Sequence, residues 1–301
     1  MAKAYFTNKV LATTVVGSYP VVKGSGLRSL LDPLRSAVET AVADQVRAGI
    51  DIISDGQVRG DMIGAFSSHL AGIKEQDVIG KVQPARSPIT TADTKYAITK
   101  APKVKGIITG PSTLAHGLHL ATPMYRNKEE LALDLAAALV VEAKSLEAAG
   151  VALLQIDEPI LSTGVADLAV AKQAIELIVS SVRVPTCMHV CGNLSDVIDG
   201  ILAINVNVLD FEFSKNPQNL DLFRSRDLAG RMIGYGCVDS SSDTLETVPE
   251  IRARIEKGME VFDPRTMLID PDCGMRMRSR EVAYWKLKHM CQAAREVRLA
   301  L

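Results

Sequence analysis

The feature of this 301-residue chain that most restricts its fold is a regular alternation of short apolar runs with longer amphipathic stretches. Short runs rich in Val, Ile and Leu indicate buried strands, and stretches with apolar residues at every third or fourth position indicate helices. Strands are expected at residues 11–17, 51–54, 104–109, 152–156, 185–190, 206–213, 232–236 and 266–269. Helices are expected at residues 34–48, 128–149, 167–181, 194–204, 247–261 and 281–298. Eight such repeats predict the α/β class and a single (β/α)₈ TIM barrel over residues 1–301.

Residues 74–103 interrupt this rhythm, because a segment of that length exceeds an ordinary connection between a strand and a helix. Within it, residues 86–98 carry Thr, Tyr and Ile at strand-like spacing, which predicts a hairpin over the barrel mouth. The first loop, residues 21–32, contains Lys23-Gly24-Ser25-Gly26 and could also close the site or receive a partner. Plain surface decoration is an equal alternative for both segments.

The composition excludes several classes of function. With 34 basic and 35 acidic residues the net charge is −1, which gives no electrostatic footprint for nucleic acid or a membrane surface. The longest apolar stretches fall short of the roughly 18–20 residues that span a bilayer, and the N-terminus lacks the apolar run of a secretory signal. Five cysteines form no disulfide framework, which favours a reducing cytoplasm.

Polar, ionisable or Gly/Pro residues follow every expected strand. The carboxyl ends of barrel strands meet at one face, where the active sites of such barrels lie. An inert scaffold would not need chemistry at each of these positions. The residues in question are Gly17-Ser18, Asp55-Gly56-Gln57, Gly110-Pro111-Ser112, Asp157-Glu158-Pro159, His189-Val190-Cys191, Glu212, Asp239 and Asp272-Cys273.

Four of these side chains, His189, Cys191, Glu212 and Cys273, are ligand types of a tetrahedral Zn²⁺ site. Their spacing is too dispersed for a zinc finger, so three converging strand ends predict a catalytic zinc at the C-terminal ends of the strands. The alternative is that His189 and Cys191 are simply buried strand residues. Strand alternation places Cys187 on the same face, as a packed neighbour below the site or as a ligand itself. Of the remaining cysteines, Cys237 could point into the barrel, and Cys291 is expected on a helix face.

Five motifs carry a resemblance to a known family. They match in order the C-terminal catalytic barrel of cobalamin-independent methionine synthase, over nearly the whole chain and in the short single-barrel form of archaea. The zinc ligands also resemble the wider family of barrels that move methyl groups from corrinoid proteins to coenzyme M. The motifs are Thr13-Thr14-Val15-Val16-Gly17-Ser18-Tyr19-Pro20, Gly110-Pro111-Ser112-Thr113-Leu114, Gln155-Ile156-Asp157-Glu158-Pro159, His189-Val190-Cys191-Gly192 and Asp272-Cys273-Gly274.

The ligand types agree with methyl transfer to a thiol. Two thiolates and a carboxylate leave the resting zinc site with a charge near −1, which keeps a bound sulfur nucleophilic. A free thiol has a pKa near ~8.5, whereas a coordinating thiol is deprotonated outright. The resemblance to methionine synthase implies that homocysteine is the methyl acceptor. Glu212, the hardest donor, is expected to leave the metal when the substrate sulfur arrives.

The resemblance also implies where an amino acid binds. Backbone N–H groups around Val16, Gly17 and Ser18 would receive the α-carboxylate, and Asp157 would pair with the α-ammonium. The family places a glutamate where this chain has Gln57, whose neutral amide can still accept a hydrogen bond. The expected catalytic residues are Asp157 and Glu212.

The methyl donor is inferred from departures from the family pattern. A tryptophan, a glutamate and a histidine of the pterin-using enzymes are absent from three segments of this chain. An N5-methyl pterin reacts poorly unless its nitrogen is protonated, so their loss predicts a methylcorrinoid donor, presented by a corrinoid protein. The alternatives are a methylcorrinoid:coenzyme M methyltransferase, a methyl-tetrahydropterin-using synthase and a non-catalytic zinc- or thiol-binding protein. The three segments are Ala115-His116-Gly117, Ile160-Leu161-Ser162-Thr163 and Asp239-Ser240-Ser241-Ser242.

Overall fold

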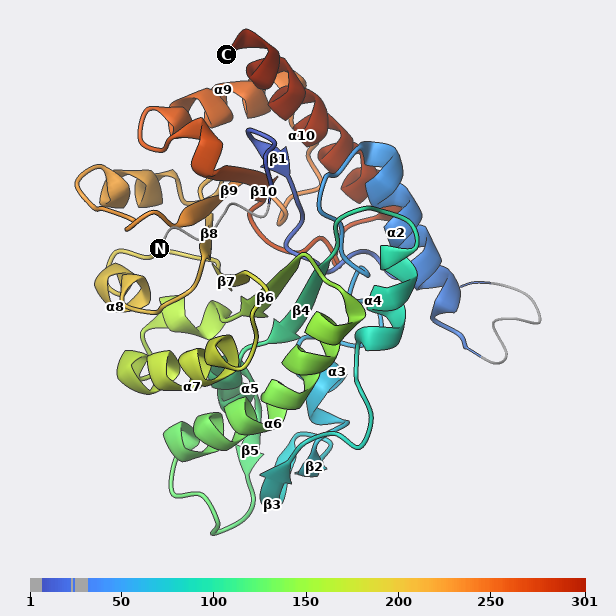
Figure 1. The fold of residues 1–301 in the computed structure, drawn as a ribbon, viewed down its shortest axis with the longest axis vertical. Helices are drawn as coiled ribbons and strands as arrows, with labels where there is room; N and C mark the ends of the chain where they lie inside the picture. Colours follow the sequence, from blue (N-terminus) through green and yellow to red (C-terminus); the bar gives the residue numbers. More distant parts are fainter. Residues whose placement is uncertain (1–6, 23, 25–31) are drawn as a thin grey trace.

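A curled, parallel seven-stranded sheet with helices on its outer face forms the body of the protein in a computed structural model that describes residues 7–22, 24 and 32–301 (Figure 1). Apolar strands followed by amphipathic helices pack in this way because each helix buries one face of the sheet. In the order in which they pair, the strands are β1 (Ala12–Thr13), β10 (Met267–Pro271), β9 (Met232–Val238), β8 (Val208–Glu212), β7 (Thr186–Val190), β6 (Leu153–Asp157) and β4 (Lys105–Thr109).

The two edge strands of this sheet, β1 and β4, are joined through a short segment between them. Thr14 pairs with Ile52 and Ile53 pairs with Val104, both in parallel orientation. The Thr14 hydroxyl also donates to the carbonyl of Ile52 at 2.9 Å. The α/β class with a parallel sheet is thus confirmed, while the strand expected at residues 51–54 is reduced to isolated bridges.

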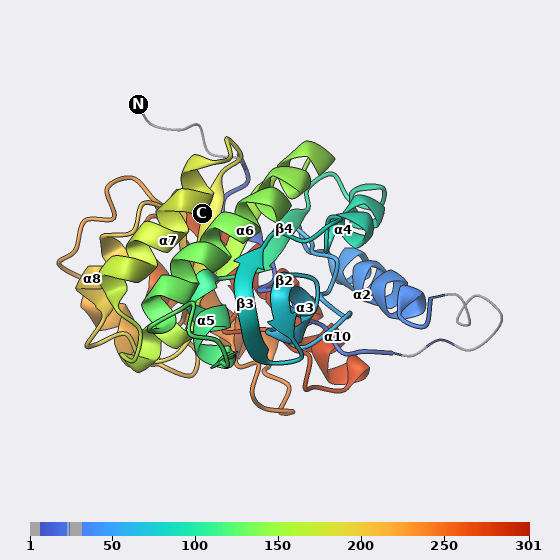
Figure 2. The same cartoon turned by 90° about the horizontal axis from the view of Figure 1, so that it is seen from below.

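The outer layer consists of the helices that follow the strands (Figures 1 and 2). Side chains that accept backbone N–H groups begin four of them, and Gly49 and Gly150, at positive φ, end α2 and α6. All six expected helices are present, although α8 is much shorter than residues 194–204. These helices are α2 (Arg35–Ala48), α6 (Lys128–Ala149), α7 (Leu168–Ser180), α8 (Ile198–Leu202), α9 (Val248–Met259) and α10 (Arg280–Ala300).

The remaining elements are short and lie in the connections. A small sheet contains β2 (Ala71–Lys74), β3 (Asp77–Gln83) and β5 (His119–Leu120), in the order β2-β3-β5. Three further helices and three 3₁₀ segments complete the described residues: α3 (Gly64–Ser67), α4 (Thr91–Ile98), α5 (Pro111–Gly117), η1 (Pro159–Thr163), η2 (Pro217–Phe223) and η3 (Pro264–Thr266).

The hairpin predicted within residues 86–98 is wrong in position. The hairpin is formed by β2 and β3, which precede that stretch, while α4 occupies most of the stretch itself. Val78 and Val82 turn to the apolar core, and the hairpin lies beside α6 rather than in the wall of the mouth cavity (Figure 2). In the first loop, residues 23 and 25–31 lie outside the described residues, so its role in closing the site stays a prediction.

Buried apolar side chains form two separate clusters, one on each face of the curled sheet. The larger lies between the sheet and the helices and includes Cys237, which therefore does not point into the barrel as the sequence suggested. The smaller closes the interior near the N-terminal ends of the strands, and we call it the barrel floor. It includes Cys187, as expected for a packed neighbour below the site. The floor consists of Ala12, Ile52, Leu153, Cys187, Val208, Met232 and Leu268.

Among the described residues, no helix is both long and apolar enough to cross a membrane.

Candidate metal centre

Three of the four predicted metal ligands come together at the C-terminal ends of the strands. His189 lies on β7, Cys191 directly follows β7, and Cys273 follows β10. Their ligand atoms all lie within 4.8 Å of one another, and the two Sγ atoms are 3.9 Å apart. Strand ends that are remote in sequence therefore meet at one point, as the barrel topology predicts.

Glu212, the fourth predicted ligand, ends β8 but does not belong to this cluster. One of its carboxylate oxygens accepts the backbone N–H of Gly192 at 3.2 Å, and the other accepts the Asn216 side-chain amide. The carboxylate is thus held beside the cluster by two donors of its own.

The surroundings of His189 fit a metal ligand. Its ring is buried, with Nδ1 3.3 Å from Oδ1 of Asp210, yet neither ring nitrogen makes a hydrogen bond of acceptable geometry to any residue that the structure describes. Buried polar atoms are rarely left unsatisfied in native proteins. An imidazole with a free nitrogen beside two thiols is a donor set that Zn²⁺ accepts, with the carboxylate behind it as the usual orienting partner.

The two thiols differ in how readily they ionise. Contact with the Cys191 thiol lowers the pKa of Cys273 well below the ordinary value, against the opposing effect of burial. The pKa of Cys191 is raised in turn, first by the contact with Cys273 and then by burial. The contact between the two thiols thus favours the thiolate on Cys273, and thiolate is the form that binds metal.

A buried carboxylate ties together the two strand ends that carry Glu212 and Cys273. Asp272 accepts the consecutive backbone N–H groups of Phe213, Ser214 and Lys215 at 3.1, 2.9 and 2.9 Å. Burial raises the pKa of Asp272 to about 8 in spite of these donors. Because Asp272 precedes Cys273, this clamp fixes one ligand relative to the end of β8.

The residues predicted to bind the amino acid share one cavity of about 210 Å³ with the metal cluster. Gly17 lies just behind its wall, since a Cβ atom there would come within 2.7 Å of Oε1 of Gln57 and 2.4 Å of Cδ1 of Ile107. A larger residue at this position would force the ends of both side chains to shift. The predicted residues that line the cavity are Val16, Ser18, Gln57, Asp157, His189, Cys191 and Cys273.

The neighbouring acids Asp157 and Glu158 have separate roles. Asp157 faces the cavity, and burial raises its pKa to about 6. Glu158 turns away and accepts the backbone N–H groups of Ser112 and Thr113 at 2.9 and 2.8 Å, at the start of α5. A helix-capping role thus holds for Glu158 alone, whereas Asp157 faces the cavity.

Sequence reasoning missed part of the cavity wall. Arg276 lines it and donates to the main-chain carbonyl of Gln57 at 2.9 Å, and its position three residues after Cys273 could have indicated this. Asp55, which the strand-end pattern placed at this face without a role, also lines the cavity, and burial raises its pKa to about 6. An apolar side of the wall had no signal in the strand-end pattern: it comprises Val58, Met62, Ala65, Phe66 and Ile89.

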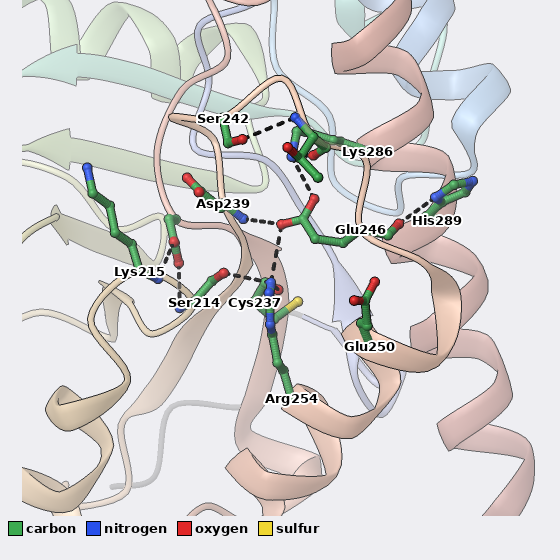
Figure 3. Close-up of polar contacts among 12 residues, drawn as sticks. Ser214, Lys215, Cys237, Asp239, Ser242, Glu246, Glu250, Arg254, Lys286 and His289 are labelled. Atoms are coloured by element: carbon green, nitrogen blue, oxygen red, sulfur yellow. Dashed lines mark hydrogen bonds and ion pairs between the residues drawn. The ribbon is translucent and has the colours of Figure 1, made fainter.

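One predicted strand end points elsewhere. Asp239 follows β9, but its carboxylate accepts the N–H and hydroxyl of Ser241 rather than lining the cavity. Its backbone N–H donates to Glu246 at 2.7 Å. Glu246 in turn accepts from Lys286 at 2.6 Å and Arg254 at 3.2 Å, so two cations anchor this loop to α9 and α10 (Figure 3).

Comparisons with known proteins agree on one family. Residues 11–296 match the family model described as the catalytic domain of cobalamin-independent synthase. A methionine synthase from Methanothermobacter marburgensis is 42% identical over 95% of this chain and 100% of its own length. One from Methanocaldococcus jannaschii is 41% identical over 96% of this chain and 100% of its own length.

A solved structure supports the same relationship. A B12-independent methionine synthase from a Shewanella species, in complex with selenomethionine, is 25% identical to this chain. It superposes with a TM-score of 0.83, covering 97% of this chain and 100% of that chain. Sequence and fold therefore point to one set of relatives over nearly the full length.

Proposed function

This chain belongs to the catalytic-domain family of cobalamin-independent methionine synthases, and from that membership we propose that it makes methionine by transferring a methyl group to the sulfur of homocysteine. One observation carries the proposal: the cavity joins Asp157 and the Val16–Ser18 turn to the His-Cys-Cys cluster. An amino-acid thiol needs a carboxylate for its ammonium group, donors for its carboxylate and a place for its sulfur. The volume of the cavity also suits a small amino acid, because pockets for drug-sized ligands measure roughly 300–1,000 Å³.

The methyl donor predicted from the sequence, a methylcorrinoid or corrinoid protein, is contradicted by this membership. Both the family description and the Shewanella relative specify independence of cobalamin. Of the alternatives, we propose a methylated tetrahydropterin instead. As the new S–CH₃ bond forms, the N5–CH₃ bond of the donor breaks, and N5 must take up a proton.

The absence of a histidine after β9 had suggested that no acid was present. Asp55 answers that objection, because it lines the same cavity and has a pKa of about 6. A carboxyl group with such a pKa is protonated in a minor fraction of molecules at neutral pH, and that fraction can release its proton to a reacting atom. We assign Asp55 as the candidate proton donor.

We propose that zinc is held by His189, Cys191 and Cys273, with Glu212 as the exchangeable fourth ligand. Its contacts with Gly192 and Asn216 support this, since they offer the carboxylate a position away from the cluster. When bound, zinc would keep a sulfur ligand deprotonated at neutral pH. Two thiol ligands require a reducing compartment, so we place the enzyme in the cytoplasm.

The protein side of the reaction is positioning. Asp157 would accept the α-ammonium group, and the backbone of Val16, Gly17 and Ser18 would receive the α-carboxylate. A buried charge on the substrate needs such partners. Gln57 would accept one further hydrogen bond from the ammonium group. For the scaffold, we take the bridges at Ile52 and Ile53 as the eighth strand of a closed (β/α)₈ barrel.

The function is tested by incubating zinc-loaded protein and homocysteine with methyl-tetrahydrofolate or methyl-tetrahydromethanopterin and measuring methionine. Methylcobalamin serves as the comparison donor. Formation of methionine from a pterin supports the proposal, and turnover with methylcobalamin alone would refute the donor. Coenzyme M is added as a competing thiol, because its faster methylation would rule out an amino-acid substrate.

The metal assignment is tested by replacing one cysteine at a time. Cys273→Ser should lose zinc and activity, because a serine hydroxyl is not readily deprotonated as a ligand. Cys187→Ser is the matched control: its side chain belongs to the barrel floor, so zinc content should be unchanged. Loss of zinc in the control and retention in Cys273→Ser would show that the ligands are assigned wrongly.

A further inference from the structure

A lysine that the reaction does not use directly is buried inside the sheet. Lys105, the first residue of β4, is 1% exposed, and its Nζ donates to Oε1 of Gln155 at 2.6 Å. It forms no ion pair within the part of the chain that the structure describes. Burying an ammonium group without a contacting carboxylate is costly, so a positive reason for keeping it is needed.

Gln155 connects this lysine to both ends of the proposed amino-acid site. Its side chain is fully buried on β6, and its Nε2 donates to the carbonyl of Val16 and to Oδ1 of Asp157, both at 2.7 Å. One amide group therefore touches the turn that would receive the α-carboxylate and the side chain that would bind the α-ammonium.

The orientation of this amide is decided by Lys105. An ammonium group has three donors and no acceptor, so only the amide oxygen can face it. The NH₂ group must then face Val16 and Asp157, both of which offer oxygen acceptors. If the amide rotated by half a turn, its oxygen would meet two other oxygens and all three hydrogen bonds would be lost.

We propose that Lys105 and Gln155 are positioning residues that set the selectivity of the cavity for an amino-acid thiol. Neither lines the cavity, so they act through Asp157 and the Val16 turn. The inference rests on the proposed function, because it assumes that these two groups bind homocysteine.

Two variants test the proposal. Lys105→Met removes the donors with a side chain of similar length, and Gln155→Glu keeps the acceptor for Lys105 but has no N–H. Each should raise KM for homocysteine at least tenfold, about 1.4 kcal/mol, with kcat within about threefold of the wild-type value. Methylation of propane-1-thiol, which lacks both charged groups, should not change.

The matched control is Lys286→Met, which removes a second fully buried lysine at a site outside the cavity. It should leave the ratio of homocysteine to propane-1-thiol methylation at the wild-type value. A purely structural role for Lys105 would instead slow both thiols equally. Equal loss for both thiols in Lys105→Met would therefore overturn the proposal.

Calorimetric binding of homocysteine to the zinc-loaded proteins separates this inference from the proposed function. If the wild type binds homocysteine but forms no methionine, the function fails while the positioning role is still measured. Weaker binding by both variants supports the positioning role, and wild-type binding by both contradicts it. If Lys105→Met does not fold, Gln155→Glu alone decides in the same two directions.

Discussion

Two lysines are fully buried among the described residues, and they are compensated in different ways. Lys286, on α10, pairs with the Glu246 carboxylate and also donates to the carbonyl of Thr244, each at 2.6 Å (Figure 3). Lys105, inside the sheet, contacts the neutral amide of Gln155. A contacting carboxylate neutralises Lys286, which we call the outer lysine, whereas no carboxylate contacts Lys105, the inner lysine, among the described residues. A gain in stability therefore accounts for the burial of Lys286 but not for that of Lys105.

Among the described residues, no ion pair joins Lys105 to the two acids that are buried in the same interior. Asp210 and Asp270 lie fully buried in the same interior, and their carboxylate oxygens make no hydrogen bond of acceptable geometry among the described residues. Burial raises the pKa of Asp270 well above the ordinary value, and Lys105 acts in the opposite direction. Burying Lys105, Asp210 and Asp270 together costs stability. Proteins accept such a cost mainly at functional sites, where a defined polar arrangement is needed.

The largest difference between the two lysines is expected in the free energy of unfolding. Lys286→Met leaves Glu246 buried with only Arg254 as its cation and should cost about 3 kcal/mol. Lys105→Met should cost about 1 kcal/mol or less, because removing an uncompensated charge offsets the lost hydrogen bond. Urea denaturation at fixed zinc content measures both free energies of unfolding. Equal losses in the two variants would show that the two lysines do not differ in their contribution to stability.

The next effect concerns the carboxylate that the inner lysine helps to orient. Asp157→Asn removes the negative charge opposite the α-ammonium group and should lower kcat/KM for homocysteine about 100-fold, or about 2.7 kcal/mol. Propane-1-thiol should react as before. Asp239→Asn is the matched control. Asp239 follows a strand end as Asp157 does, but it contacts the Glu246 network of Lys286 and does not line the cavity. A similar loss of kcat/KM in that control would contradict a specific role for Asp157 in binding the α-ammonium group.

A smaller effect is expected from pH. Burial raises the pKa of Asp157 to about 6, and an acid with a raised pKa is ionised only above that value. Preference for homocysteine over 4-mercaptobutanoate, which lacks the ammonium group, should be constant above pH 6 and fall up to tenfold for each unit below it. Lys105 lowers the pKa of Asp157, so Lys105→Met should move this break to higher pH. Lys286→Met should not move it.

The smallest effect is expected at the edge of the outer network. Arg254, one of the two cations on Glu246, also donates to the Ser214 hydroxyl at 2.6 Å. Ser214→Ala should therefore cost about 1 kcal/mol of stability and leave thiol preference unchanged. Thermal unfolding measures the first quantity and a two-thiol competition assay the second. A change in preference would show that the outer network reaches the cavity.

Much of the site could be predicted because strand alternation and barrel topology determine it together. Period-two spacing places Asp157 on the inner face of β6 and His189 on that of β7, and parallel pairing sets them side by side. The same spacing also places Gln155 on the inner face. Its partner Lys105 was missed because the contact depends on the stagger between β4 and β6, which no local pattern encodes.

Other features depend on contacts that are remote in sequence. The start of α4 is held by Glu142 of α6, which accepts the N–H groups of Ile89 and Thr90 at 2.7 and 2.8 Å. Without that tertiary contact, the β-branched residues here resemble a strand, which explains the misplaced hairpin. The donor prediction failed for another reason: it counted missing residues at the family's positions and gave no acid role to Asp55, although the strand-end pattern had placed Asp55 at this face.

The barrel floor has a kinetic consequence. Its seven apolar side chains lie near the N-terminal ends of the strands and leave the cavity with an opening at the other end. Reactants and product must then share one route, and a retained product blocks the next molecule of acceptor. Methionine should therefore act as a competitive inhibitor against homocysteine, and its departure should set an upper limit on turnover.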